Sequence, residues 1–280
     1  MSKEIINIDS SKCIGCGSCV SDCLRKRLLL VDEKCIVNEE IPCIECGHCI
    51  AICPVNAFTM NGYDNKEVIE YTPEKFDISS ENLLNFIKYR RSIRQFKDDA
   101  VNDEVIRRVI EAGRFTPTAA NRQNVRYIIL KDRLPEMREM SLKVLYDIAS
   151  NNPDDNAVSN LGVYRSKWIS NYEGYVHSNI DRMFFDAPAV LLVIGSSISS
   201  GWVELNAGLA SSSIGLMLNT EGLGSCYIGF FGIAAEICPD INKTLGIGDD
   251  EAIVATLAVG YPKVKFKRTA LRKPARIDIF

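Results

Sequence analysis

Residues 13–23 read CIGCGSCVSDC, and residues 43–53 read CIECGHCIAIC. Both stretches space four cysteines as C-x2-C-x2-C-x3-C, and the second begins thirty positions after the first. Nine of the 11 cysteines in the 280-residue chain lie between Cys13 and Cys53. Cysteines crowded in this way indicate metal binding in a reducing compartment, where disulfides are rare. The two stretches therefore predict a small N-terminal domain organised around bound metal.

The spacing of the cysteines suits cuboidal iron–sulfur clusters. Three thiolates separated by two residues each reach three irons of one [4Fe–4S] cluster, and in the two-cluster pattern the fourth cysteine of each run serves the other cluster. We expect one cluster on Cys13, Cys16, Cys19 and Cys53, and a second on Cys43, Cys46, Cys49 and Cys23. Zinc stays open as an alternative, although structural zinc sites usually pair C-x2-4-C knuckles and do not use runs of four.

Residues 1–60 resemble the bacterial two-[4Fe–4S] ferredoxins in both runs of cysteines. Cys35 is surplus to the eight ligands, and we expect it to be a small buried or loop residue. His48 lies between two ligands, but a Rieske site needs two histidines and the other histidine, His177, is far along the chain. His48 is therefore expected to be a bystander or a hydrogen-bond donor.

Composition limits the partners and the location of the protein. Apolar residues make up 46% and charged residues 25% of the chain, which are ordinary values for a globular protein. The formal net charge of -3 offers no broad basic surface for nucleic acid or an anionic membrane. The longest apolar stretch, residues 187–195, is too short to span a bilayer, and the first residues lack the apolar core of a signal peptide. We expect a cytoplasmic protein that binds neither nucleic acid nor membrane.

Beyond the cysteine-rich domain, placed at residues 1–62, a polar linker is expected at 63–80 and a second domain at 81–280. Ser79 or Ser80 is expected to cap one helix of this domain, and Asn102 to cap another that ends at Gly113. Apolar runs predict further elements, namely strands at 126–131, 189–194 and 252–259 and a helix at 205–218 that we interpret as dimer packing. The intermixed strands and helices predict the α+β class, with a mixed sheet flanked by helices.

Two polar segments of the second domain suit a cofactor. Residues 90–94, RRSIR, place three guanidinium groups and a hydroxyl within five residues, which suits a phosphate. A solvated basic face is the alternative. Residues 116–123, TPTAANRQ, combine small side chains that permit the close approach of a flat ring with amide groups that donate and accept hydrogen bonds. An ordinary loop is the alternative there.

Taken in order, the two segments resemble the FMN-dependent nitroreductase family over residues 85–280, as do GLGS at 222–225, IG at 228–229 and VGYP at 259–262. The resemblance implies an intertwined homodimer with FMN at the interface. It implies that Arg90, Arg91 and Ser92 contact the phosphate and ribityl end, that Arg272 returns to the phosphate, and that Arg94 approaches the pyrimidine side of the flavin. It also implies contacts from Pro117, Thr118, Ala119 and Asn121 of the opposite subunit, with Ile228 and Gly229 against the isoalloxazine. Gln123 is added as a cofactor-binding residue for its amide group.

These features together predict an FMN-dependent oxidoreductase of nitroreductase type. Two clusters would pass single electrons to FMN, which would then reduce a small organic acceptor such as a nitroaromatic or a quinone. No G-x-G-x-x-G follows a strand, so a dinucleotide-binding domain of Rossmann type is not expected. The expected external donor is ferredoxin, with NAD(P)H open as the other candidate. An electron carrier or redox sensor that relays electrons to a partner protein is the alternative function.

Two further features of the second domain stay open. Cys226 lies in a flavin-proximal motif and is interpreted as a small buried residue, with a redox-active thiol as the alternative. The segment at 146–186 carries scattered aromatic residues, which either form a lid over a planar acceptor or anchor the segment to the body of the domain.

Overall fold

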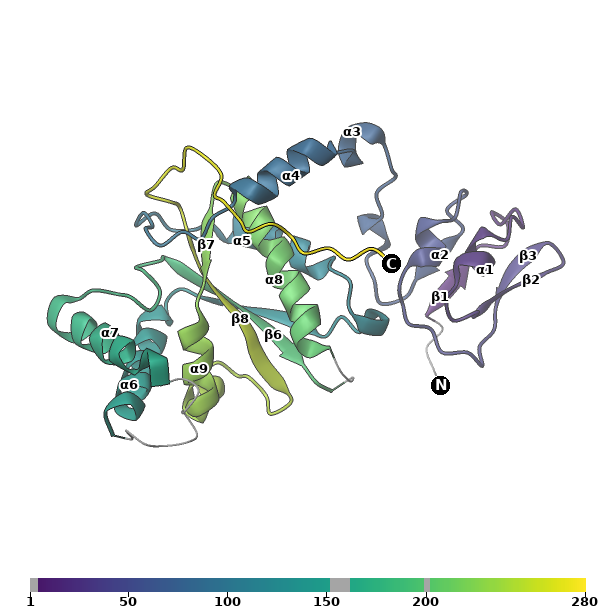
Figure 1. Cartoon of the computed structure of the whole chain (residues 1–280). Helices are drawn as coiled ribbons and strands as arrows, with labels where there is room; N and C mark the ends of the chain where they lie inside the picture. Colours follow the sequence, from purple (N-terminus) through teal and green to yellow (C-terminus); the bar gives the residue numbers. More distant parts are fainter. Residues whose placement is uncertain (1–4, 152–161, 199–201) are drawn as a thin grey trace. The chain divides into compact units, whose positions relative to one another are not determined.

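The computed structural model describes residues 5–151, 162–198 and 202–280 (Figure 1). The chain divides into two compact units, one of Met1–Ile78 with Ala120–Arg122 and one of Ser79–Ala119 with Gln123–Phe280. None of the helices in the described ranges is both long and apolar enough to cross a membrane.

The first unit consists of short elements around the two cysteine runs. Strand β1 (Ile6–Ile8) pairs with β4 (Phe58–Met60), and β2 (Leu28–Val31) pairs with β3 (Lys34–Val37), both antiparallel. Helices α1 (Ser18–Asp22) and α2 (His48–Ala51) each follow a glycine in the left-handed region, with φ of 76° at Gly17 and 73° at Gly47. Glycine is the residue that adopts this conformation without steric cost, and it lets each run turn directly into its helix. The segment that follows contains only η1 (Asn65–Glu67) and α3 (Pro73–Phe76), neither of which buries a residue.

The second unit is built on a four-stranded sheet with the order β5–β6–β8–β7. The strands are β5 (Val125–Leu130), β6 (Ala189–Ser196), β7 (Gly224–Tyr227) and β8 (Glu251–Gly260). The α+β class is confirmed, but the prediction of a mixed sheet is wrong for the described strands. All three pairings are antiparallel, and the parallel contact is an isolated bridge between Ser92 and Ser225. Strands that are apolar on both faces are typical of parallel sheets, but here helices cover both faces of an antiparallel one.

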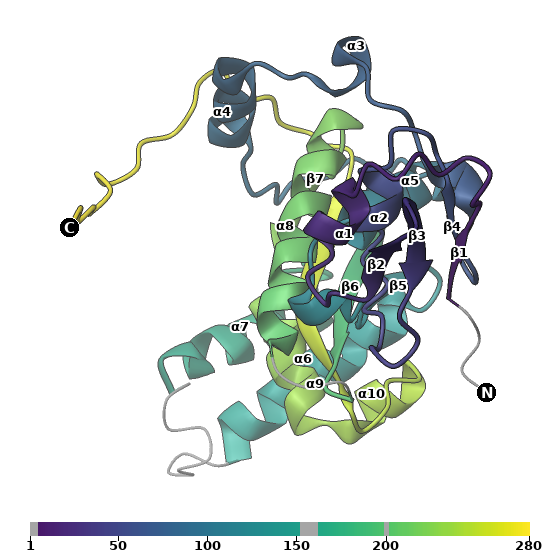
Figure 2. The ribbon, with the colours of Figure 1, turned by 90° about the vertical axis from the view of Figure 1, so that its right-hand side faces the viewer.

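Strand β6 shows how both faces of the sheet are covered. Val190, Leu192 and Ile194 pack in a core formed with α6 (Leu134–Asn151), α7 (Arg165–Ser178) and α9 (Gly229–Ile237). The alternate residues Ala189, Leu191 and Val193 pack in a second core with α5 (Asp103–Arg114) and α8 (Val203–Thr220). Successive strand residues point to opposite faces, so both cores need apolar residues from β6. Figure 2 shows α8 running along its face of the sheet.

Both predicted helix caps are confirmed. Ser79 Oγ accepts a hydrogen bond from Asn82 N at 3.1 Å at the start of α4 (Ser80–Tyr89), and Asn102 Oδ1 accepts one from Glu104 N at 2.7 Å at the start of α5. The prediction that Gly113 ends α5 is wrong, because the helix continues to Arg114. A Cβ at Gly113 would lie 2.6 Å from Tyr127 Oη and 2.7 Å from Ile214 Cδ1. Gly113 therefore serves the close packing of α5 on β5 and α8.

The aromatic segment at 146–186 includes the end of α6 and all of α7, and its residues 152–161 lie outside the described residues. Trp168 is 1% exposed and Phe184 is fully buried. The Tyr172 ring stacks on that of Tyr146 with 4.3 Å between centroids. Trp168 and Phe184 belong to the core of the unit and Tyr172 packs against it, so these three aromatic side chains anchor the segment to the body of the unit, as one of the two interpretations expected.

Candidate functional site

The arginine-rich segment of the second unit is held against one end of the sheet. Ser92 forms the parallel bridge to Ser225 of β7, and Ile93 N donates to Ser225 O at 3.0 Å. Five residues beyond Ser92, Lys97 N donates to Tyr261 O, just after β8, at 2.8 Å. Both ends of the segment are therefore fixed by backbone hydrogen bonds, which sets the positions of its arginines relative to the sheet.

Two glycines in the GLGS and VGYP motifs allow this close approach. A Cβ at Gly224 would lie 2.3 Å from Ile93 Cγ1, a distance that real Cβ atoms essentially never show. A Cβ at Gly260 would lie 2.6 Å from Pro188 Cδ and 3.0 Å from Phe96 Cδ1. Side chains at these positions would displace the arginine segment from the sheet, so the motif glycines have a packing role at this site.

The three guanidinium groups of the segment form no ion pair with an acidic side chain in the described ranges of the chain. Arg90 and Arg91 are half-buried, whereas Arg94 is exposed and lies over the Phe185 ring with 6.0 Å from Cζ to the ring centroid. An uncompensated cluster of guanidinium groups suits a multivalent anion such as a phosphate, which accepts bidentate hydrogen bonds.

Cys226 links this segment to the predicted ring-binding residues. The side chain is 3% exposed, which confirms the interpretation of a small buried residue. Burial raises the pKa of the Cys226 thiol, and the adjacent Arg94 and Ser92 side chains oppose the rise. Ile228 follows two residues later, and Gly229 begins α9. The structure thus brings the arginine segment and Ile228–Gly229 together around β7.

The polar loop after α5 depends on a residue that no motif singles out. Asn206 of α8 is 2% exposed; its Oδ1 accepts a hydrogen bond from Ala119 N at 3.1 Å, and its Nδ2 donates to Asn124 Oδ1 at 3.0 Å. Within the loop, Gln123 N donates to Thr118 Oγ1 at 2.9 Å. The sequence signal for Asn206 is an amide side chain directly ahead of a run of small and apolar residues, at 207–218, where a buried polar group needs partners.

Residues 120–122 of the same loop belong to the first unit by their contacts. Asn121 Nδ2 donates to Ile44 O at 3.0 Å and to Glu45 O at 2.9 Å. Ala120, Asn121 and Gln123 have positive φ values of 51°, 53° and 50°. Such strain in residues with a Cβ clusters at ligand sites. Within the described ranges, no hydrogen bond joins residues 117–121 to the arginine segment of the same chain.

Arg272 lies in the extended segment that follows β8. Its Nη1 donates to the neighbouring Leu271 O at 3.1 Å, and its side chain is exposed. The segment passes α4, where Tyr89 Oη donates to Phe266 O at 2.7 Å (Figure 2). The contact of Arg272 with a phosphate stays a prediction.

In the first unit, one small cavity is lined by Cys23, Cys43, Cys46 and Cys49 together. These are the four residues predicted for the second cluster, including the one that crosses over from the first run. Among the described residues, no group of three or more Cys, His, Asp or Glu side chains could hold a metal ion.

Two further residues of this unit have the environments expected for them. Cys35 is 5% exposed, and its Sγ lies 3.5 Å from Cys19 Sγ. His48 Nδ1 lies 3.0 Å from Asp22 Oδ2, so the histidine of α2 is hydrogen-bonded to the last residue of α1. Both predictions, a buried cysteine and a hydrogen-bonding histidine, are confirmed.

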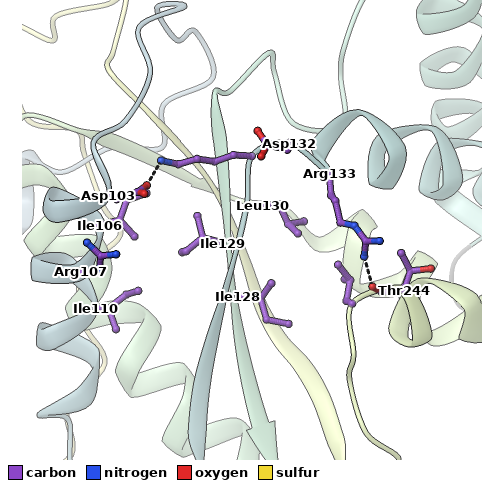
Figure 3. A pocket seen from close by; sticks show the side chains of 12 residues that line it. Asp103, Ile106, Arg107, Ile110, Ile128, Ile129, Leu130, Asp132, Arg133 and Thr244 are labelled. Atoms are coloured by element: carbon purple, nitrogen blue, oxygen red, sulfur yellow. Dashed lines mark hydrogen bonds and ion pairs between the residues drawn. The ribbon is translucent and has the colours of Figure 1, made fainter.

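A groove of about 530 Å³ lies along the outer edge of β5 (Figure 3). Its floor is apolar, with Ile106 and Ile110 from α5 and Ile129 from β5. Lys131 and Asp103 line it as well, and Lys131 Nζ pairs with Asp103 Oδ1 at 2.5 Å. The groove includes none of the residues predicted to bind FMN. It follows the edge of β5 that faces away from β6, where no described strand is paired.

The fold and the site define an α+β protein whose antiparallel sheet carries a segment with three arginines at one end. The model of the nitroreductase family matches residues 87–261, more than half of the chain, so the chain belongs to the nitroreductase family. This membership confirms the prediction of a nitroreductase-type oxidoreductase. The matched residues include neither cysteine run.

Individual proteins show the same likeness. A putative NADH dehydrogenase/NAD(P)H nitroreductase of Archaeoglobus fulgidus is 25% identical over 183 residues, which cover 65% of this chain and 87% of the relative. Iodotyrosine deiodinase of Hydra vulgaris is 21% identical over 201 residues, with 69% of each chain covered. A nitroreductase of Bacteroides fragilis, solved with bound FMN, has a TM-score of 0.56 at 17% identity and covers 70% of this chain and 98% of its own. The similarity to the solved Bacteroides fragilis structure supports the fold.

Proposed function

We propose that this chain is an FMN-dependent oxidoreductase that reduces a small organic acceptor with electrons supplied through two [4Fe–4S] clusters. The flavin part is carried by one observation, the three arginines without acidic partners that are fixed beside β7. It is supported by the solved structures of a Bacteroides fragilis nitroreductase and an iodotyrosine deiodinase, both described with FMN bound. Bound FMN would supply the hydride and single-electron chemistry, and the protein would supply orientation and electrostatics.

The residues of the site have distinct proposed roles. Arg90, Arg91 and Ser92 hold the phosphate and ribityl end, where guanidinium forks donate bidentate hydrogen bonds. Arg94 lies against the pyrimidine side, where its charge stabilises the negative charge that reduction adds to the ring. The remaining proposed contacts are Ile228 and Gly229 from the same chain, Pro117, Thr118, Ala119, Asn121 and Gln123 from a second subunit, and Arg272 at the phosphate.

The cluster part of the proposal rests on the cysteine runs. The ligand sets are Cys13, Cys16, Cys19 and Cys53 for the first cluster site, and Cys23, Cys43, Cys46 and Cys49 for the second. The shared cavity of the second set supports the crossover of Cys23. The left-handed glycines ahead of α1 and α2 support the proposed cluster sites in general, because they let each run bend tightly around a compact group.

Anaerobic reduction of the bound flavin tests the whole route. Chemically reduced ferredoxin is expected to bleach the flavin absorbance faster than NADH does, because the clusters accept single electrons. Stopped-flow absorbance of the purified full chain would measure both rates. Rapid reduction by NADH together with no reduction by ferredoxin would show that the clusters are not the entry point for electrons.

The proposed assembly is a homodimer, and the β5 groove offers a place for part of the second copy. Within the last seven residues, PARIDIF, apolar and polar side chains alternate from Ala275 to Ile279. Ile277 is 74% exposed and Ile279 is 93% exposed, so both apolar side chains are open to solvent. An exposed segment with a two-residue period suits addition to a free strand edge, where backbone hydrogen bonds and alternate side chains both contribute. We therefore place residues 274–280 of the second copy along β5.

Ending the chain at Lys273 is expected to weaken this dimer at least about tenfold, because backbone pairing and two apolar anchors are lost together. Sedimentation velocity over a concentration series would measure the dissociation constant. The double substitution Ile277→Asp/Ile279→Asp should have the same effect, whereas Arg276→Ala should have little. An unchanged dissociation constant in the truncated chain would place the dimer contact elsewhere.

A further inference from the structure

The cavity shared by Cys23, Cys43, Cys46 and Cys49 is also lined by two arginines, Arg25 and Arg27. Arg25 is exposed, as is the adjacent Lys26, whereas Arg27 is only 9% exposed. It immediately precedes β2, whose first residue, Leu28, is 1% exposed and belongs to the core of the unit. The position of Arg27 beside the cavity is therefore fixed by the strand that follows it.

The guanidinium group of Arg27 has few partners for a buried charge. Its Nη1 donates to Ile41 O, and its buried Nε has no hydrogen-bond partner among the described residues. No acidic side chain in the described part of the chain pairs with it. Arginine stays protonated in proteins, and an isolated buried charge is costly without a counterion. An anionic group bound in the cavity would therefore compensate the buried charge of Arg27.

The first cluster site is different. The cation in contact with its ligand Cys13 is Lys34, whose Nζ donates to Cys13 O at 2.6 Å. Lys34 is exposed, so water and salt screen its charge. Arg27 is shielded from water, and its electrostatic effect on a neighbouring group is correspondingly larger.

We propose that Arg27 is the counter-charge of the second cluster site and raises the reduction potential there above that of the first site. A cluster with four thiolates is already anionic, and one added electron increases its negative charge, so a fixed cation favours the reduced state. Electrons entering the unit would then collect at the site that holds Cys23, Cys43, Cys46 and Cys49. This role rests on the proposed clusters. Arg27 would act on the cluster through its charge and would not be a ligand of the iron.

Redox titration of the anaerobically purified full chain tests the inference. Dithionite gives one electron to each cluster without a change in bonds or protons, and electron paramagnetic resonance follows the two signals separately. Arg27→Gln is expected to lower the reduction equilibrium constant of one cluster about tenfold, which is about 59 mV for one electron. Arg27→Lys should restore most of the shift, and the exposed control Lys26→Gln should leave both potentials unchanged.

The possible outcomes separate the two proposals. Absence of iron and sulfide from the wild-type chain would refute the clusters themselves. Three results would overturn the role of Arg27 alone. The first is that neither potential changes in an iron-replete Arg27→Gln variant, and the second is that both potentials shift equally in that variant. The third is that Lys26→Gln produces the same shift as Arg27→Gln. If Arg27→Gln loses the second cluster and keeps the first, the counter-charge is needed for assembly of the second site, which supports the inference, whereas loss of the first cluster alone would overturn it. Loss of both clusters would show a general folding role and overturn it.

Discussion

Replacing Cys23 with serine is expected to remove the proposed second cluster, whose other ligands are Cys43, Cys46 and Cys49. The proposed first cluster, which has three of its ligands in the same run as Cys23, should stay in place. Cys23 lines one cavity with Cys43, Cys46 and Cys49, although nineteen residues separate it from the nearest of them in sequence. Cys23→Ser and Cys43→Ser should therefore lose the same cluster. In each variant, iron and acid-labile sulfide should fall by about half, because one of two equal clusters is lost.

The comparison with the first ligand set completes this test. Cys13→Ser and Cys53→Ser should both lose the first cluster, so the signal remaining in paramagnetic resonance should be the one that Cys23→Ser lacks. Cys238→Ser, outside both runs, should keep both signals. If Cys23→Ser and Cys13→Ser retain the same signal, each run closes on its own cluster and the crossover is wrong. A colourless wild-type protein that contains zinc would rule out clusters altogether.

The double substitution Arg90→Ala/Arg91→Ala is expected to weaken FMN binding by about a hundredfold or more. Hydrogen bonds to charged groups contribute about 1.5–3 kcal/mol each, and about 1.4 kcal/mol corresponds to tenfold in affinity. Both arginines are half-buried and lack acidic partners in the described ranges, so an anion would not have to displace an existing ion pair. Quenching of flavin fluorescence on titration of the apoprotein would measure the dissociation constant.

A matched control and a second ligand make this result specific. Lys88→Ala removes an exposed cation two residues away on α4 and should change FMN affinity little. Riboflavin lacks the phosphate, so the double variant should bind riboflavin nearly as well as the wild type does. An equal loss for both ligands would mean that the arginines act on the ring or the fold instead of the phosphate.

Local features of the fold were predictable from sequence because their causes are local. The caps at Ser79 and Asn102 require only a side-chain oxygen ahead of an apolar periodic run. The strand at 189–194 was visible as a continuous apolar run, but its antiparallel pairing was not. Strand direction depends on the route of the chain between strands, and a strand covered on both faces has the same composition in either kind of sheet.

The chemistry of the site was predictable from sequence, but the residues that hold its segments in position were not. Three arginines in five residues indicate an anion whatever the fold, since guanidinium groups suit phosphate. Ser225 and Tyr261, which fix that segment, lie more than a hundred residues further along, and no spacing rule relates them to it. Asn206 was missed for the same reason, because its two partners are in a loop remote in sequence. The close contacts of Gly113, Gly224 and Gly260 likewise arise only from tertiary packing.

The position of β8 has a consequence for how the protein forms during synthesis. It is the last strand of the sheet in the chain, yet it lies between β6 and β7. During synthesis on the ribosome, β6 and β7 therefore cannot pair with β8 until residues 251–260 have emerged. Their apolar faces stay exposed during that interval. Contacts between residues remote in sequence form slowly, and such intermediates are prone to aggregation. We expect the nascent chain to depend on chaperones until β8 closes the sheet, with flavin uptake among the last events of its maturation.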